Sequence, residues 1–169
     1  EPISRVEAVP LGEAAGRVLA ADVVAGFDVP PFDRAAMDGY AVKAKDTRGA
    51  AKDSPIRLKL IGAQHTGELY GGEVGVGEAL EIATGSPIPR GSDAVVMVEY
   101  TALEGDMVTV YREVKLGRNI APAGEDMKEG DHVLSSGSAL SPGMVGALAA
   151  LGYAEVQVYE KPRVAIYSS

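Results

Sequence analysis

The segment from residue 30 to residue 42, PPFDRAAMDGYAV, combines residue types that could bind a cation. Two prolines stiffen its entry, and Asp33 and Asp38 lie five residues apart around a turn of small residues. Gly39 allows the backbone to turn sharply directly after Asp38. An aspartate held at a rigid turn could ligate a hard cation such as Mg²⁺, which prefers carboxylate oxygen. The alternative is that both aspartates only accept hydrogen bonds from nearby backbone N–H groups, as aspartates often do in turns.

A second segment, residues 82–94 (IATGSPIPRGSDA), could bind an anion. A strand-like run leads into Thr84, Gly85 and Ser86, and a Pro-x-Pro bend follows. Hydroxyl groups and free backbone N–H groups at such a turn can form an anion-binding concavity. The segment is not a Walker loop, because the pattern Gly-x₄-Gly-Lys-[Ser/Thr] is absent. The alternative is a turn whose hydroxyl groups are satisfied locally.

A third segment, residues 117–131 (GRNIAPAGEDMKEGD), is polar and punctuated by glycine. Glu125 and Asp126 could face a metal or a substrate, and Arg118 and Lys128 could pair with them. The alternative is a solvated linker between two lobes of the fold.

Composition excludes several classes of site. The 169 residues carry a net charge of −8, which is wrong for general binding to nucleic acid. The absence of Cys excludes thiol nucleophiles, disulfides and Cys-based zinc sites. His65 and His132 lack metal-ligand spacing and are interpreted as ordinary surface or structural residues. No apolar run is long enough to span a membrane. Residues 34–59 carry a net charge of +4, typical either of a solvated loop and edge strand or of a surface that faces an anion.

The elements that must position these segments are mostly short strands. Val and Ile together outnumber Leu more than twofold, and 21 Gly and 10 Pro predict many sharp turns. Strands are expected within residues 22–25, 40–42, 56–61, 79–82, 94–99, 107–111, 133–134 and 155–159. Residues 103–106 predict a hairpin turn between the runs at 94–99 and 107–111.

Two helices and one further strand complete the expectation. Apolar residues repeat at helical spacing over residues 8–20. A second helix should begin at Ser141, which can cap free N–H groups, and end at Gly152. The β-branched run at 162–167 predicts the beginning of a strand.

Together these elements predict an α+β fold that is mainly β and consists of two lobes. A β-barrel-like lobe over residues 27–125 is inserted into a small mixed α/β lobe formed by residues 1–26 and 126–161. Residues 162–169 are expected to start a further domain.

The three polar segments, taken in this order, resemble the molybdopterin molybdenumtransferase family of the MoeA and gephyrin E-domain type. The resemblance lies in residues 30–42, in IATGSPIPRGSDAVVMVE at 82–99 and in GRNIAPAGEDMKEGDHVL at 117–134, and it covers essentially the whole chain. It implies an enzyme of molybdenum cofactor biosynthesis. Such enzymes insert molybdenum from molybdate into adenylylated molybdopterin and release AMP, assisted by Mg²⁺, as cytoplasmic homodimers.

The resemblance also implies which residues act. Asp38, Thr84 and Asp126 match functional positions of the family and are expected to be catalytic, with Asp38 also a metal ligand. Three further residues are expected to bind substrate: Arg34, Gly85 and Ser86. Arg34 and Ser86 differ from the residues common in the family, and Arg34 would add positive charge beside Asp38.

The resemblance finally implies a longer parent enzyme, whose molybdopterin-binding α/β domain should begin at residues 162–169. We therefore expect this chain alone to be catalytically inactive, and we expect the active cleft to lie where the β lobe of one subunit faces that domain of the other. Small-molecule substrates are expected, with neither nucleic acid nor membrane as a partner. Two alternatives stay open: a non-catalytic dimerisation or scaffold module of the same fold, and a stand-alone oxyanion-binding domain.

Overall fold

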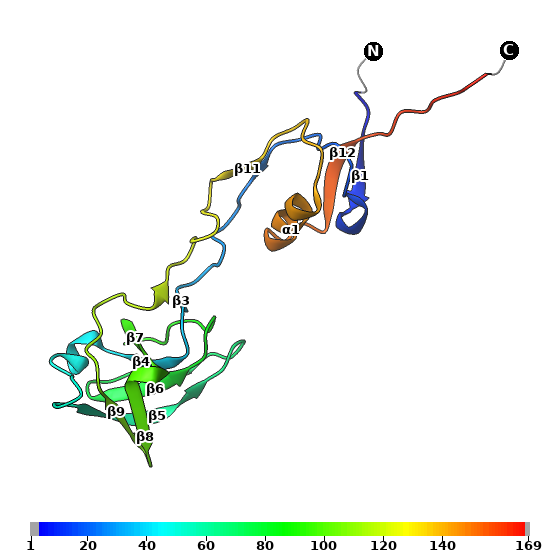
Figure 1. Ribbon diagram of the computed structural model, residues 1–169. Helices are drawn as coiled ribbons and strands as arrows, with labels where there is room; N and C mark the ends of the chain where they lie inside the picture. Colours follow the sequence, from blue (N-terminus) through cyan, green and yellow to red (C-terminus); the bar gives the residue numbers. More distant parts are fainter. Residues whose placement is uncertain (1–3, 168–169) are drawn as a thin grey trace. The chain divides into compact units, whose positions relative to one another are not determined.

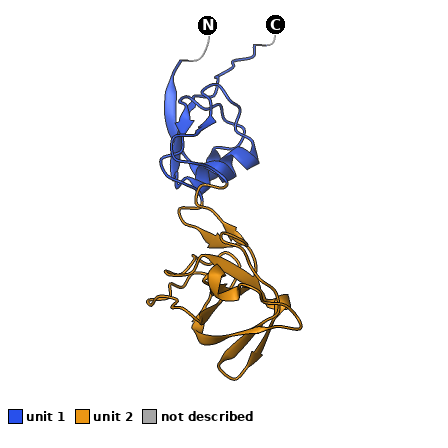
Figure 2. Ribbon diagram, turned by 90° about the vertical axis from the view of Figure 1, so that its left-hand side faces the viewer, with its two compact units in different colours: residues 1–29, 126–169 blue, residues 30–125 orange. Residues whose placement is uncertain are grey.

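A computed structural model describes residues 4–167, which divide into two compact units. The first unit contains residues up to 29 and from 126 onward, and the second contains residues 30–125 (Figure 2). The second unit is therefore inserted into the sequence of the first. The sequence placed the corresponding boundaries at 26–27 and 125–126.

Two short strand pairs join the beginning of the chain to its end in the first unit (Figure 1). β1 (Val6–Pro10) runs antiparallel to β12 (Glu155–Tyr159), with Val6 opposite Tyr159. β2 (Val23–Val24) runs antiparallel to β11 (His132–Leu134), with an irregularity in the register. The strands expected at 22–25, 133–134 and 155–159 are thus confirmed.

The helix expected after Ser141 is confirmed as α1 (Pro142–Ala150). The Ser141 side chain accepts a hydrogen bond from the Met144 N–H at 3.3 Å, which satisfies one of the free donors of the first turn. Gly152, the second residue after the helix, adopts a φ of 78°, a left-handed conformation that glycine reaches without steric cost. No helix within residues 4–167 has the length and apolar character needed to cross a membrane.

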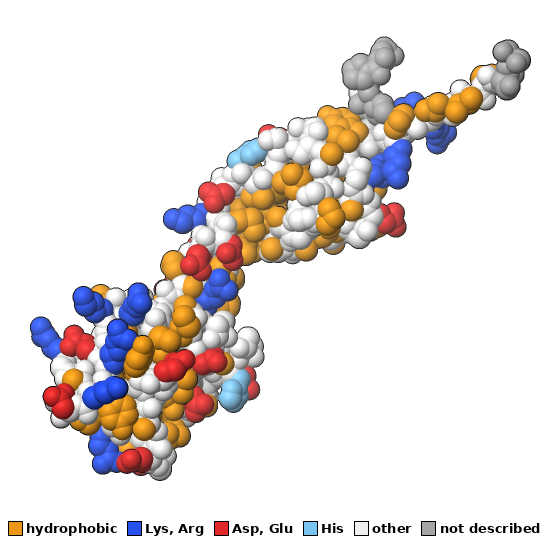
Figure 3. Space-filling model, in the orientation of Figure 1, with side chains coloured by type: hydrophobic (Ala, Val, Ile, Leu, Met, Phe, Trp, Pro, Cys, Tyr) orange, Lys and Arg blue, Asp and Glu red, His pale blue; other side chains and the backbone are white. Residues whose placement is uncertain are grey.

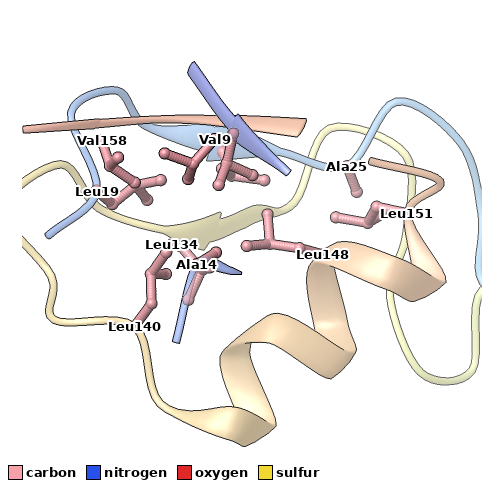
Figure 4. Packing of buried hydrophobic residues seen from close by; sticks show 11 residues of the cluster. Val9, Ala14, Leu19, Ala25, Leu134, Leu140, Leu148, Leu151 and Val158 are labelled. Atoms are coloured by element: carbon pink, nitrogen blue, oxygen red, sulfur yellow. The ribbon is translucent and has the colours of Figure 1, made fainter. Parts of the chain in front are cut away.

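The core of the first unit packs α1 against the strands (Figure 4). Its buried side chains come from both stretches of the sequence: Val9, Ala14, Leu19, Val23, Ala25, Leu134, Leu140, Leu148, Leu151, Val156 and Val158. The two stretches of the first unit therefore form one core, although 96 residues of the second unit separate them in the sequence.

The helix expected over residues 8–20 is wrong. The backbone is extended in β1, and only a single 3₁₀ turn, η1 (Leu11–Glu13), follows. Gly16 has a φ of 76°, which is incompatible with a continuing right-handed helix. Ala14 and Leu19 are nevertheless buried. The apolar spacing marked residues of the core, but turns and extended backbone bring them there.

A six-stranded sheet forms the centre of the second unit (Figure 1). In spatial order its strands are β7 (Ala94–Met97), β4 (Gly39–Val42), β6 (Glu78–Ile82), β5 (Ile56–Gln64), β9 (Met107–Val110) and β8 (Thr101–Glu104). All neighbours are antiparallel except β5 and β6. A separate pair joins β3 (Arg34–Ala35) to β10 (Ile120–Ala121). The expectation of a mainly β fold is confirmed.

The hairpin of the second unit differs in part from the expectation. The run at 94–99 ends as β7 at Met97, and the 3₁₀ turn η3 (Val98–Tyr100) separates it from the hairpin. The strand that precedes the hairpin turn is instead β8, in which Glu104 pairs with Met107 of β9. Gly105, with a φ of 61°, supplies the expected tight turn. Because η3 interrupts the chain after β7, the strand that leads into the hairpin turn at Gly105 is a separate strand, β8.

The strand expected at residues 162–167 is wrong. This segment has no regular secondary structure, and Val164 and Ile166 are 78% and 91% exposed. A strand is stabilised by hydrogen bonds to a neighbouring strand. None of the strand pairs among the described residues includes this segment, so its β-branched composition alone produces no strand.

Candidate functional site

The antiparallel pairing of β4 with β6 brings Asp38 and Thr84 together. Gly39, the first residue of β4, lies opposite Ile82, the last residue of β6. Asp38 directly precedes β4 and Thr84 follows β6, so both residues lie at the same end of the strand pair. The Thr84 backbone N–H and hydroxyl donate hydrogen bonds to Asp38 Oδ1 at 2.7 and 2.8 Å.

These two hydrogen bonds favour the ionised form of Asp38. The backbone N–H of Thr84 is the larger cause and its hydroxyl the second, and together they lower the pKa of Asp38 below its ordinary value. Both donors bind Oδ1, and no described residue donates a hydrogen bond to Oδ2. Asp38 is therefore an ionised carboxylate with one oxygen held and the other open to a ligand.

Gly39 fixes the backbone next to this carboxylate. A Cβ atom at Gly39 would lie 2.0 Å from the carbonyl oxygen of Val96 in β7, so only glycine fits between β4 and β7. The Val98 N–H donates to the Asp38 carbonyl oxygen at 3.1 Å. Asp38 is thus held by its backbone on one side and by its side chain on the other.

The backbone N–H groups of the turn at residues 83–86 all have hydrogen-bond acceptors within the second unit. The Thr84 N–H binds Asp38, the Gly85 N–H binds the Ala35 carbonyl at 2.8 Å and the Ser86 N–H binds the Ala83 carbonyl at 3.1 Å. For the backbone N–H groups of this turn, the structure supports the alternative of donors that are satisfied locally. The hydroxyl of Thr84 likewise donates to Asp38, so both donors of Thr84 bind this carboxylate.

Ser86 is fully buried, and its backbone carbonyl accepts a hydrogen bond from the Ala35 N–H at 2.9 Å. Its Oγ has no hydrogen-bond partner among the described residues. Gly85 adopts a φ of 83°, which the turn requires. Both residues shape the turn, and the substrate contacts expected of them stay predictions.

A hollow of about 340 Å³ opens beside Asp38. It is lined by Asp38, Gly39, Tyr40, Gln64, His65, Glu81, Ile82, Ala83 and Val98. The pKa of the Tyr40 phenol is raised, mainly by burial and to a smaller extent by the charge of Glu81 on the paired strand. The hollow therefore places a neutral phenol and two carboxylates within one small space.

His65 is a lining residue that the sequence analysis set aside. The parallel pairing of β5 with β6 places Gln64 opposite Ile82, so the residue after β5 arrives beside the turn that follows β6. Thr66 Oγ1 donates to the Thr84 carbonyl at 3.1 Å and ties the two turns together. Only the register of the sheet, and no local motif, could have identified His65.

Arg34 and Asp33 have partners in the second unit. The Arg34 guanidinium donates to Glu125 Oε2 at 3.2 Å, which directs this cation toward a carboxylate of the chain. Asp33 Oδ1 accepts the Ala123 N–H at 2.8 Å. For Asp33 the structure supports the alternative that it caps backbone groups. The expected substrate contact of Arg34 stays a prediction.

Asp126 belongs to the first unit, where its backbone N–H donates to the Val29 carbonyl at 3.0 Å. Asp38 and Thr84 belong to the second unit. The structure therefore brings Asp38 and Thr84 into contact, while the shared site with Asp126 stays a prediction.

The donors near Asp38 bear on which metal could bind. Within residues 4–167 no three side chains of the types His, Cys, Asp or Glu lie close enough to hold an ion together. Mg²⁺ is commonly held by one or two carboxylates and completes its shell with water and substrate phosphate. One open carboxylate oxygen on Asp38 fits that mode of binding.

Comparison with known proteins identifies the relatives of this chain. Residues 2–152 match the family model described as the MoeA N-terminal region (domain I and II). The molybdopterin molybdenumtransferase of Staphylococcus aureus strain N315 is 39% identical over 161 residues, and that of Bacillus subtilis strain 168 is 40% identical over 167 residues. The alignments cover 95% and 96% of this chain but only 38% and 39% of those relatives.

A solved structure shares the fold. The crystal structure of the molybdopterin biosynthesis moeA protein from Pyrococcus horikoshii OT3 superposes with a TM-score of 0.91 at 48% sequence identity. The superposition covers 96% of this chain and 43% of that protein. The chain therefore spans about two fifths of the length of the proteins it matches.

Proposed function

Since the chain belongs to the MoeA N-terminal family, we propose that it is part of an enzyme of molybdenum cofactor biosynthesis. That enzyme inserts molybdenum from molybdate into adenylylated molybdopterin and releases AMP. The names of the curated relatives support the assignment, and the activity is proposed for the full-length protein because the alignments cover about two fifths of those relatives.

The observation that carries the proposal is the Asp38–Thr84 pair at the edge of a hollow. Release of AMP requires cleavage of a phosphoanhydride, a group that is densely negative. An ionised carboxylate beside such a group can orient a water molecule or hold a cation against it. We assign this role to the open oxygen of Asp38. Thr84 is a positioning residue, because its hydroxyl proton is already donated to Asp38.

Mg²⁺ is part of the proposal, with Asp38 Oδ2 as the protein oxygen that would hold it. When bound, the ion would neutralise charge on the phosphate oxygens of the substrate. Thr84 lowers the pKa of Asp38 and so further favours the ionised form that this role requires. The homodimer and the cytoplasmic location belong to the same proposal, and light scattering of the full-length protein tests the first of them.

The decisive experiment measures AMP release by the full-length protein with adenylylated molybdopterin, molybdate and Mg²⁺. Asp38→Asn keeps the shape of the side chain and removes its charge, so we expect a loss of about 10²-fold or more in rate. Asp33→Asn is the matched control: its amide oxygen can still accept the Ala123 N–H, and we expect close to normal activity. Activity in both variants would remove Asp38 from the reaction, and inactive wild-type protein would contradict the proposed function.

A further inference from the structure

A second hollow in the unit of residues 30–125 lies apart from Asp38. It has a volume of about 400 Å³ and is lined by Val96, Met97, Tyr100, Arg112, Glu113, Val114, Lys115, Arg118 and Asn119. It shares none of these lining residues with the hollow beside Asp38. It therefore needs an explanation of its own.

The polar lining of this hollow is mainly cationic. Arg112, Lys115 and Arg118 contribute three positive charges, and Glu113 is the only acid of the lining. Glu113 Oε2 already accepts a hydrogen bond from the Gly49 N–H at 2.7 Å. On a chain with a net charge of −8, three cations around one small hollow attract an anion. Figure 3 shows several Lys and Arg side chains on this unit.

The loop that carries Lys115 and Arg118 is held in place by the edge of β7. The Gly117 N–H donates to the Asp93 carbonyl at 2.8 Å, and the Val95 N–H donates to the Arg118 carbonyl at 3.1 Å. Asn119 follows with a φ of 60°, a left-handed conformation that few residue types other than glycine adopt. Its side-chain Nδ2 donates to the Val95 carbonyl at 2.7 Å. The bonds of the loop use backbone atoms and the Asn119 amide, and the Lys115 and Arg118 side chains line the hollow.

The part of the lining formed by Tyr100 and residues 112–114 is also ordered. The Arg112 guanidinium lies over the Tyr100 ring, 4.5 Å from its centroid, a cation–π contact that restricts the side chain. The Tyr111 N–H donates to the Tyr100 carbonyl at 2.9 Å, and the Val114 N–H donates to the buried Thr47 hydroxyl at 3.1 Å. Ordered walls reduce the conformational entropy that a ligand must overcome on binding.

We propose that this hollow binds the phosphate group of a small molecule. The two arginines and the lysine of the lining match the charge and the hydrogen-bond acceptors of a phosphate. The volume lies at the lower end of the range for small-ligand sites, which leaves room for one phosphate and a modest organic group. The inference rests on the charges and the backbone bonds of the loop, and it does not depend on the proposed function.

The test is calorimetric titration of the full-length protein with AMP, adenosine and inorganic phosphate. We expect AMP to bind and adenosine to bind at least about tenfold more weakly, since only AMP carries the charged group. Inorganic phosphate binding as tightly as AMP assigns the site to the free ion, whereas tighter binding of AMP assigns it to a phosphate ester. Absence of binding by both phosphate compounds at millimolar concentration overturns the proposal.

Variants locate the bound phosphate. The double variant Lys115→Gln, Arg118→Gln removes two charges without touching the backbone bonds of the loop, and we expect AMP binding to weaken at least about tenfold. Lys52→Gln with Arg90→Gln is the matched control, since these cations of the same unit lie outside the lining, and we expect its affinity to change less than twofold. Equal losses in both double variants indicate general charge attraction and overturn the proposal.

Asp38→Asn separates this site from the hollow beside Asp38. We expect it to retain the AMP binding that Lys115→Gln, Arg118→Gln weakens, because Asp38 does not line this hollow. Loss of AMP binding in Asp38→Asn, with binding intact in Lys115→Gln, Arg118→Gln, places the ligand beside Asp38 and overturns the inference.

Discussion

Thr84 controls the ionisation of Asp38 through two donors that can be separated by mutation. Thr84→Val removes the hydroxyl and keeps the backbone N–H, which is the larger cause of the lowered pKa. We expect the pKa of Asp38 to rise part of the way toward its ordinary value, measured by NMR titration of the carboxyl carbon. Ser92→Ala removes a hydroxyl that donates to the Pro89 carbonyl in the same unit and should leave this pKa unchanged. An unchanged pKa in Thr84→Val contradicts the positioning role of the hydroxyl.

The same shift gives the stability of the chain a pH dependence with a definite sign. The folded pKa of Asp38 is lowered, so ionised Asp38 stabilises the fold at pH values above the ordinary aspartate pKa. This contribution disappears as the pH falls through the lowered pKa. In Thr84→Val the pKa of Asp38 in the folded state lies closer to its pKa in the unfolded state. The variant should therefore lose less stability on acidification than wild type.

Among the described glycines, Gly39 is the one at which an added Cβ atom would make the shortest contact. A methyl group there would meet the Val96 carbonyl oxygen at 2.0 Å, and two backbone strands would have to separate. We expect Gly39→Ala to lower the free energy of unfolding by about 3 kcal/mol or more, measured by urea denaturation. Gly71→Ala is the control because nothing lies within 4 Å of a Cβ atom at that position. Equal stability of the two variants would mean that β4 and β7 are not packed as described.

At the scale of elements, the start of α1 depends on a local capping residue, Ser141, which is recognisable in the sequence. Ser141→Ala removes the acceptor of the Met144 N–H, and we expect a loss of about 1 kcal/mol in stability, measured by thermal or urea unfolding. Ser141→Asp retains an acceptor and should restore most of it. Ser138→Ala is the control, since the Ser138 hydroxyl has no hydrogen bond within the described residues. A neutral Ser141→Ala would show that tertiary packing alone forms the helix.

Structural features that are determined by a few neighbouring residues could be predicted. Features that depend on how distant segments pair or pack could not. Ser141 and Gly152 mark the two ends of α1 in the sequence itself. The apolar spacing at 8–20 predicts a helix, but Ala14 and Leu19 are buried without one, and Gly16 adopts a left-handed conformation. Residues 162–167 have strand composition without a strand beside them.

The candidate site shows the same division. The motifs around Asp38 and Thr84 singled out both residues, but their contact follows from the register of β4 and β6, which lies outside either motif. His65 was missed because it enters the hollow through the register of β5 with β6. The cationic hollow was missed because Tyr100 and residues 112–119 meet only after η3 redirects the chain.

At the scale of the whole molecule, each unit has its own apolar core. The first unit buries the cluster that includes Leu148, and the second unit buries separate clusters, one of which includes Leu80. No buried residue belongs to the cores of both units. Because hydrophobic burial dominates the stability of a domain, each unit should open with a free energy set by its own core.

Paired core substitutions test this independence. Leu148 and Leu80 are both fully buried, so Leu148→Ala and Leu80→Ala should each cost about 3 kcal/mol in their own unit. Amide hydrogen exchange reports the two units separately. In Leu148→Ala we expect faster exchange in β1 and β12 and unchanged exchange in β4 and β6, and Leu80→Ala should give the reverse pattern. Faster exchange of all four strands in both variants would show that the insertion and its host unfold as one cooperative unit, and separate cores would then not define the units of stability.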